Sequence, residues 1–316
     1  MSSLNLFTPG QIPPGGHYPG VIPRGLSSTF WYAIGTTALL QGYQGPLFEA
    51  KRVSDGATQM FNAGSDGHVN LNDLVAFSGG GDVKVNRFVD QVTATDMTTA
   101  ANTAYIVESG TPVIRLGKLA ARFKPNSGIY TLTRNTPTPP HDIITLFLGV
   151  CDVAPPDTQY RPFYQEVGST TLGLKFGFST NPSFDRGIMY YSPSSGSQNS
   201  FQVMHDRFNA ANVPKLMGYV MISENTYQPR VHPPLIGGSF QSIPAPAVND
   251  GIINTTNFSF RIGQIADIHS PTSWSNHEVT IFGSAALRDI WPTYGISLTV
   301  TSAAYVLGNE IKGYMQ

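Results

Sequence analysis

Acidic residues are the first candidates for chemistry in this chain, which has 20 of them. A glycoside hydrolase needs two carboxylates across one sugar bond, about 5–5.5 Å apart for retention or 6.5–9.5 Å for inversion. Asp90 ends an apolar strand pattern beside Gln91, which favours a turn or capping acid that binds backbone donors. Glu49 alternates with Lys51 in another strand pattern, which favours a surface ion pair. No catalytic pair emerges, and we expect no enzyme activity.

Metal-binding patterns are weak. The segment Ser65–Asp73 carries oxygen side chains at alternating positions, as a calcium loop does. Counted from Asp66, the twelfth position is Phe77 instead of a bidentate glutamate, so the pattern favours a turn and helix cap, and calcium stays open. The single cysteine, Cys151, follows an apolar run and is expected to be a small buried hydrophobe. The seven histidines show no metal-ligand spacing, no G-x-S-x-G elbow occurs, and we expect no cofactor.

Three polar segments rich in aromatic residues are candidates for glycan contact: Ser179–Gly187, Tyr190–Ser200 and Ser223–Pro234. Sugar sites combine flat rings with planar polar groups, although such segments are also ordinary connecting loops of a β-sandwich. The candidate glycan-binding residues are Tyr190, Tyr191, Asn199, Tyr227 and Arg230.

Composition indicates a β protein. Hydrophobic residues make up 41% of the 316-residue chain and charged residues only 12%, while glycine and proline are abundant. Short apolar runs bounded by turn residues recur from Thr29 to the end, a rhythm typical of a sandwich or barrel. The long apolar stretch His141–Val153 predicts a central strand, buried on both faces or bulged. One short helix is expected within Val69–Gly81, capped by Asn70 or Asn72, with Leu74 and Phe77 inward and Gly79 to Gly81 ending it.

The net charge of −1 argues against a nucleic-acid partner, and no apolar run is long enough for a membrane span. The N-terminus lacks the pattern of a signal peptide, so we expect synthesis in a host cytoplasm and export by another route, such as lysis.

Residues 1–26 differ from the rest because proline and glycine recur every few positions. Such a segment should form an extended arm, since proline fixes φ and glycine disfavours regular structure. Four apolar residues spaced along it are candidate contacts with a partner: Phe7, Ile12, Tyr18 and Ile22. The arm predicts docking onto a partner subunit, either another protein or a copy of this chain. Residues 27–316 are expected to form one domain, with the structure of 302–316 left open.

Several short motifs follow one another between Trp31 and Phe123. They are the strand Trp31–Ile34, the Tyr43, Gly45 and Pro46 pattern, Arg52–Asp55, then Gly67, Leu71, Leu74, Phe77 and Gly79, Asp90–Gln91, Thr99–Asn102, Ile106–Val107, Gly110–Thr111 and Gly117–Phe123. In order and spacing this stretch resembles the concanavalin-like domain of arabinofuranosidase B-type proteins, which also occurs in phage structural proteins. Phe88-Val89 replaces the Trp-Tyr that this family has before the Asp-Gln pair, and no motif here matches the family's catalytic carboxylates.

The resemblance implies an all-β, two-sheet antiparallel jelly-roll sandwich, to which the proline and glycine pattern of residues 1–26 adds an extended N-terminal arm. We therefore expect a non-enzymatic phage virion protein, associated with the capsid, tail or baseplate and docked through residues 1–26. The alternative is a glycan-binding adhesin or receptor-binding module directed at a host surface glycan, and the second alternative is a polysaccharide hydrolase.

Overall fold

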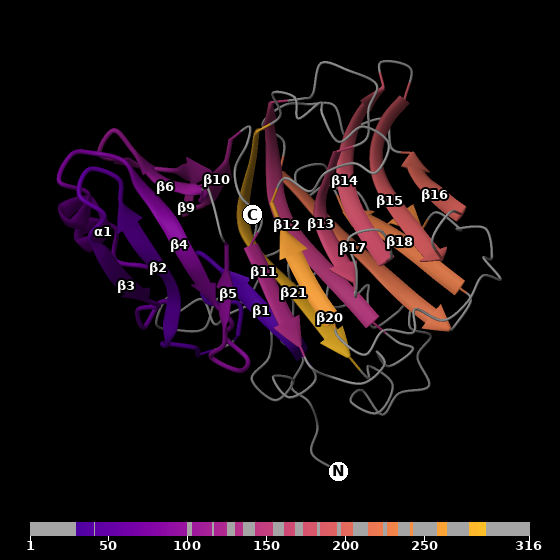
Figure 1. Ribbon diagram of the computed structural model, residues 1–316, viewed down its shortest axis with the longest axis horizontal. Helices are drawn as coiled ribbons and strands as arrows, with labels where there is room; N and C mark the ends of the chain where they lie inside the picture. The colour runs from indigo at the N-terminus through magenta and orange to yellow at the C-terminus, as the bar shows by residue number, and fades with distance from the viewer. Residues whose placement is uncertain are drawn as a thin grey trace, which may run out of the picture.

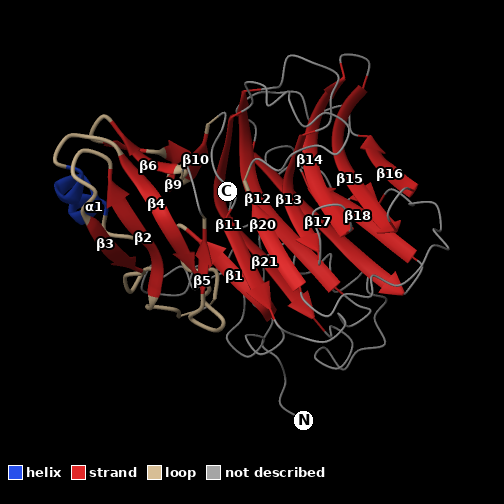
Figure 2. Cartoon of the chain, viewed as in Figure 1, coloured by secondary structure: helices blue, strands red, loops and turns tan. Residues whose placement is uncertain are grey.

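The computed structural model describes residues 30–124, apart from 41, 100–102 and 116, and the strands between residues 130 and 288. Antiparallel strands dominate this part, with a single short helix among the described residues (Figure 2). The all-β class is thereby confirmed. The predicted arm, with Phe7, Ile12, Tyr18 and Ile22, and the segment 302–316 lie outside the described residues.

Several of the first ten strands alternate buried apolar residues with more exposed polar ones, whereas β1 is apolar and buried at successive positions. In β4, for example, Val83, Val85 and Phe88 are buried, whereas Lys84 and Asn86 are half-buried. The strands are β1 Phe30–Gly35, β2 Pro46–Arg52, β3 Thr58–Asn62, β4 Val83–Val89, β5 Asp96–Thr98, β6 Tyr105–Glu108, β7 Thr111–Pro112, β8 Ile114–Arg115, β9 Lys118–Leu119 and β10 Ala121–Phe123.

Helix α1, Leu71–Ser78, lies between β3 and β4 as predicted. The Asn70 side chain accepts from the Asn72 backbone N–H at its start, and Gly79 closes it in the left-handed conformation at φ 58°. Leu74 is fully buried and Phe77 half-buried, so the expected caps and inward residues are confirmed. Among the described residues, no helix is long and apolar enough to cross a membrane, since α1 has only eight residues.

Eleven further strands follow within the described ranges. They are β11 Tyr130–Arg134, β12 Ile143–Val153, β13 Arg161–Val167, β14 Gly173–Asn181, β15 Phe184–Ser194, β16 Ser197–Met204, β17 Pro214–Ser223, β18 Thr226–His232, β19 Gln241–Ser242, β20 Phe258–Ile262 and β21 Glu278–Arg288. Strand β12 pairs on both edges, with β17 and β21, and its register against β21 shifts twice. The prediction of a central strand is confirmed, and the strand is also bulged.

Strand pairing divides at β4. The start of β4 pairs with β6, and its end, Arg87–Val89, pairs with β5. One branch runs β3–β2–β4–β6–β10–β21–β12–β17–β18–β19, and the other runs β4–β5–β11–β20–β13–β14–β15–β16. Both branches lead from β4 toward the right of the view in Figure 1. A register shift between β2 and β4 leaves Asn86 without a Cα partner on β2. Asn86 lies between the part of β4 that pairs with β6 and the part that pairs with β5.

An aromatic cluster packs β11 against β4 and β10. The Tyr130 ring lies edge-on to Phe88 and Phe123, with centroid distances of 5.0 and 5.7 Å. Its hydroxyl donates to the Val85 carbonyl and accepts from the Ala104 backbone N–H at 2.9 Å. Burial raises the pKa of Tyr130 far above its ordinary range, so the hydroxyl remains protonated and keeps donating.

Strand β1 lies against β21 next to β10 on the same edge. This close approach requires glycine at position 283, because a Cβ there would lie 2.7 Å from the Ile34 carbonyl oxygen.

Candidate functional site

Asp90 and Gln91 form a buried polar site, and Asp90 is the only buried charged residue in the described part of the chain. Asp90 has no exposed surface and Gln91 is 5% exposed. The Asp90 Oδ1 accepts from the Ala33 backbone N–H at 2.7 Å, and the Gln91 N–H donates to the Ala33 carbonyl at 2.7 Å. These two bonds satisfy the backbone of β1 at Ala33, whose Cα partner on β21 is Ala285.

The same carboxylate organises the turn that follows β4. Asp90 accepts from the backbone N–H groups of Val92 and Thr93 at 3.2 Å each, and from the Thr93 hydroxyl at 2.6 Å. Ala94, which closes this turn, has a positive φ of 55°, and its N–H donates to the Asp90 carbonyl at 2.7 Å. Asp90 is therefore a capping acid, as its sequence context predicts.

Gln91 performs the matching task for the segment after β1. Its Oε1 accepts from the N–H groups of Leu39 and Leu40 at 2.8 and 3.3 Å, and its Nε2 donates to the Thr37 carbonyl at 2.9 Å. A buried amide needs such partners because an unsatisfied polar group in the core is costly. The Asp-Gln pair thus holds β1, its following segment and the end of β4 together.

Tyr43 lies at the margin of this site. Burial raises the pKa of Tyr43 to about 12, with a smaller contribution from the negative charge of Asp90. Its hydroxyl donates to the Pro46 carbonyl at 2.8 Å. The ring lies over Gly45, where a Cβ would come within 2.7 Å of it, so the Tyr-x-Gly-Pro motif is a packing unit.

Replacing Asp90 tests this arrangement. In Asp90→Asn an amide NH₂ replaces one acceptor oxygen, so at least one buried donor loses its partner, and we expect a loss of about 2–4 kcal/mol in unfolding free energy. Urea unfolding measures it. Asp73→Asn, the same change at an exposed position in the first turn of α1, should cost less than about 0.5 kcal/mol. Equal small losses in both variants would show that Asp90 is not a structural acceptor.

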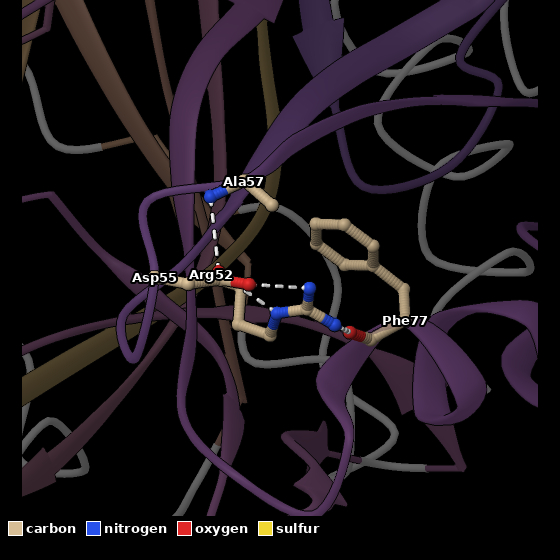
Figure 3. A network of polar contacts seen from close by, with 4 residues as sticks. All are labelled: Arg52, Asp55, Ala57 and Phe77. Atoms are coloured by element: carbon tan, nitrogen blue, oxygen red, sulfur yellow. Dashed lines mark hydrogen bonds and ion pairs between the residues drawn. The ribbon is translucent and has the colours of Figure 1, made fainter.

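The Arg52–Asp55 motif ties the β2–β3 hairpin to helix α1 (Figure 3). Arg52 donates to both oxygens of Asp55, at 2.9 and 2.6 Å, and to the Phe77 carbonyl near the end of α1 at 2.8 Å. Its guanidinium carbon lies 5.3 Å from the centroid of the Phe77 ring. Asp55 also accepts from the Ala57 N–H at 3.0 Å. Each polar group points into the hairpin or the helix end, which indicates a structural clamp.

The Arg52–Asp55 clamp predicts a contribution to folding stability that is lost at low pH. The hydrogen bonds from Arg52 and Ala57 lower the pKa of Asp55 from 3.8 to about 2. The carboxylate therefore adds stability above pH 3.8, and this contribution disappears as pH falls through 2. The difference in melting temperature between the native chain and Asp55→Asn should be largest at neutral pH and shrink toward pH 2. A difference that stays constant over this range would contradict the clamp.

Glu49 belongs to an ion-pair network on the outer face of β2 and β4. Arg87 donates to the Glu49 carboxylate at 3.0 Å and also pairs with Asp96, while the Asn86 amide donates to Glu49. The Glu49 side chain is only 18% exposed. The expected surface pair with Lys51 is therefore corrected, because the cross-strand register sets Arg87 opposite Glu49.

A second network surrounds Tyr105 on β6. The ammonium groups of Lys84 and Lys124 each lie 4.5 Å from the centroid of its ring. Glu108 accepts from Arg122 at 3.0 Å and pairs with Lys124. Burial raises the pKa of Glu108, but the contacts with Lys124 and Arg122 outweigh burial, so the pKa lies below its ordinary value. Two lysines thus lie on one ring, and one of them shares Glu108 with Arg122.

The calcium pattern forms a turn and a cap. Asp66 accepts from the His68 N–H at 2.9 Å, and Thr37 binds the Gly67 carbonyl at 2.9 Å. Asn70 caps α1, as described above. Among the described residues no three His, Cys, Asp or Glu side chains lie close enough together to hold a metal ion. The hydrogen bonds of Asp66 and Asn70 confirm the predicted turn and helix cap.

The predicted glycan-contact segments are mostly strands. Tyr190 and Tyr191 lie in β15, Asn199 lies in β16, and Tyr227 and Arg230 lie in β18. Tyr191 and Asn199 are Cα partners, so the structure brings these two together. Tyr227 and Arg230 belong to the other branch of strand pairing. The loop interpretation was wrong because each segment folds as a hairpin whose strands are separated by two residues.

Sequence reasoning missed the Tyr105 network. Its members come from β4, β6, β10 and the residue that follows β10, Lys124, and no short motif contains them together. The available signal was the alternation of Lys84 with the buried Val83 and Val85, and of Arg122 with Ala121 and Phe123. That alternation identifies an outward cation but not its neighbours on other strands.

Comparison with known proteins shows likeness in fold alone. No protein-family model matches the chain, and no curated protein does. A GH54 α-L-arabinofuranosidase soaked with a cyclic sulfate inhibitor aligns with a TM-score of 0.64 at 12% identity over 89% of this chain. An arabinofuranosidase complexed with arabinofuranosyl-α-1,2-xylobiose aligns with a TM-score of 0.62 at 12% identity, also over 89%. The chain spans 62% of the length of each. The predicted likeness to arabinofuranosidases is thereby confirmed at the level of fold.

Proposed function

We propose that this chain is a non-enzymatic structural module of a phage virion, built as a concanavalin-like, two-sheet jelly-roll. In this proposal the two branches that diverge at β4 are the two packed sheets. Residues 1–26 form an extended arm that docks the module onto the capsid, tail or baseplate.

The observation that carries the non-enzymatic part of this proposal is that several described carboxylates make hydrogen bonds and ion pairs within the fold. Asp90 is buried and binds backbone donors, Asp55 clamps a hairpin, and Glu108 pairs with two cations. Glu49 and Asp96 share Arg87. The two acids of a glycosidase must reach one scissile bond of a bound sugar. The carboxylates named here instead bind backbone N–H groups or basic side chains that hold the fold together. This supports a scaffold over a catalyst for the part of the chain whose side chains are described.

The non-enzymatic part of the proposal predicts no sugar release. The purified chain should give no product from 4-nitrophenyl α-L-arabinofuranoside or from common polysaccharides, because no catalytic acid pair is assigned. Reducing-sugar and nitrophenol assays measure this. Steady product formation that one Asp or Glu substitution abolishes would overturn it.

The arm predicts separable folding and assembly. A chain that starts at residue 27 should stay soluble with a melting temperature close to that of the full chain, because it keeps every described strand, beginning with β1 at Phe30. It should fail to join the particle or oligomer, since the apolar contacts of Phe7, Ile12, Tyr18 and Ile22 are lost, each worth about 1–2 kcal/mol.

Light scattering and co-purification with particles measure assembly, and calorimetry measures folding. Unfolding of the shortened chain would place the arm in the core, and normal assembly would make the arm dispensable. Either result contradicts the docking proposal.

Glycan binding, as in an adhesin, is the second candidate function. It is supported by the similarity in fold to an arabinofuranosidase complexed with a substituted xylobiose. Partly exposed cations around Tyr105 add a polar, charged surface on the outer side of the sheet. Binding to a panel of immobilised neutral and acidic glycans tests it, and no retention on any of them would refute it.

A further inference from the structure

We propose that the surface formed by Lys84, Tyr105, Glu108, Arg122 and Lys124, the Tyr105 site, binds the carboxylate or sulfate groups of an acidic polysaccharide. This inference rests on glycan binding, the second candidate function above, and specifies the class of glycan.

Strand register assembles the Tyr105 site. Tyr105 on β6 is the Cα partner of Lys84 on β4 and of Arg122 on β10. Neighbouring strands lie about 4.8 Å apart, so these three residues form one row across the sheet. Lys124 is two residues beyond Arg122 and therefore on the same face. Strands β2, β4 and β6, which precede β10 in this branch, lie side by side in Figure 1.

The contacts within the site hold its cations in place before any ligand arrives. Lys84 and Lys124 both lie 4.5 Å from the same ring centroid, so their ammonium groups are at most 9.0 Å apart (4.5 + 4.5). Glu108 binds Lys124 and Arg122 at its two oxygens. Long cationic side chains lose rotamer entropy when they bind, and restraint in the free protein lowers that loss.

Charge and exposure favour an anionic ligand. The three cations and Glu108 together carry a formal charge of +2 (3 − 1). The Lys124 side chain is 38% exposed and that of Arg122 is 24% exposed, so both are accessible while partly desolvated. Partial desolvation strengthens attraction between opposite charges. On β21 the Cα partner of Arg122 is Thr280, a neutral residue.

The surroundings favour a polymer with sparse charges over nucleic acid. Glu49 and Asp96 lie with Arg87 on the same outer face, and Glu49 is two residues from Lys51, the Cα partner of Lys84. Duplex DNA carries one charge per about 1.7 Å and would bring phosphates close to these carboxylates. An acidic polysaccharide can place single carboxylates or sulfates over the cations and neutral hydroxyls over the acids.

Binding of the full chain to four polymers tests the proposal: polygalacturonate for carboxylates, dextran sulfate for sulfates, neutral dextran and a DNA duplex. We expect at least one acidic polysaccharide to bind, and its affinity to fall as salt rises. The double variant Lys84→Gln/Lys124→Gln should weaken that binding about tenfold. Arg115→Gln, which removes one positive charge at the separate β8–β9 hairpin, should change it less than about twofold.

The ring has its own pair of variants. Tyr105→Phe keeps the face on which both lysines lie and should bind normally, whereas Tyr105→Leu removes it and should weaken binding about threefold. Melting temperatures of all variants show whether the fold is retained. Equal weakening by Tyr105→Phe and Tyr105→Leu would overturn the role of the ring.

The outcomes separate this proposal from glycan binding in general. If neither acidic polymer binds but a neutral glycan does, the Tyr105 site is refuted and the second candidate function stands. If no glycan binds, both fail. Binding that Arg115→Gln weakens as much as the double lysine variant, or DNA binding tighter than polysaccharide binding, would also overturn the proposal.

Discussion

The buried carboxylate of Asp90 is the interaction on which the described part of the fold depends. It holds the Ala33 backbone of β1 and organises the turn after β4, while Gln91 secures the segment that follows β1. A charge in the core is tolerated only when hydrogen bonds replace its water, and here at least four donors do so.

Strand β4 links this polar core to the rest of the molecule. Its end supports Asp90, its bulge at Asn86 precedes the division of strand pairing, and Tyr130 binds its Val85 carbonyl from β11. The outer face of the same strand carries Lys84 and Arg87, the centres of two charged networks. Strand β4 therefore leads into the Asp90 turn, carries the division of strand pairing and contributes Lys84 to the proposed binding surface.

The two outer networks differ in what they leave for a ligand. Arg87 is shared by Glu49 and Asp96, which gives that network a formal charge of −1 (1 − 2). The Tyr105 site has a formal charge of +2. Its one carboxylate, Glu108, pairs with Lys124 and Arg122, and the Tyr105 ring contacts Lys84 and Lys124 without adding a counter-charge. The Tyr105 site therefore keeps a net positive charge for an incoming anion, whereas the Arg87 network does not. This difference is the physical reason for preferring the Tyr105 site.

By itself the sequence determined the features that depend on local backbone chemistry. Turn residues between apolar runs predicted most strands, Asn70 and Gly79 marked the ends of α1, and an aspartate at a strand end predicted a cap. It failed where Pro, Asn and Ser in strands resembled loops, as in β18 and the β15–β16 hairpin, because sheet pairing overrides weak local propensity. Only the tertiary structure decided that Arg87 faces Glu49 and that Lys84, Lys124 and Arg122 surround Tyr105 and Glu108, because register between strands distant in sequence sets these neighbours.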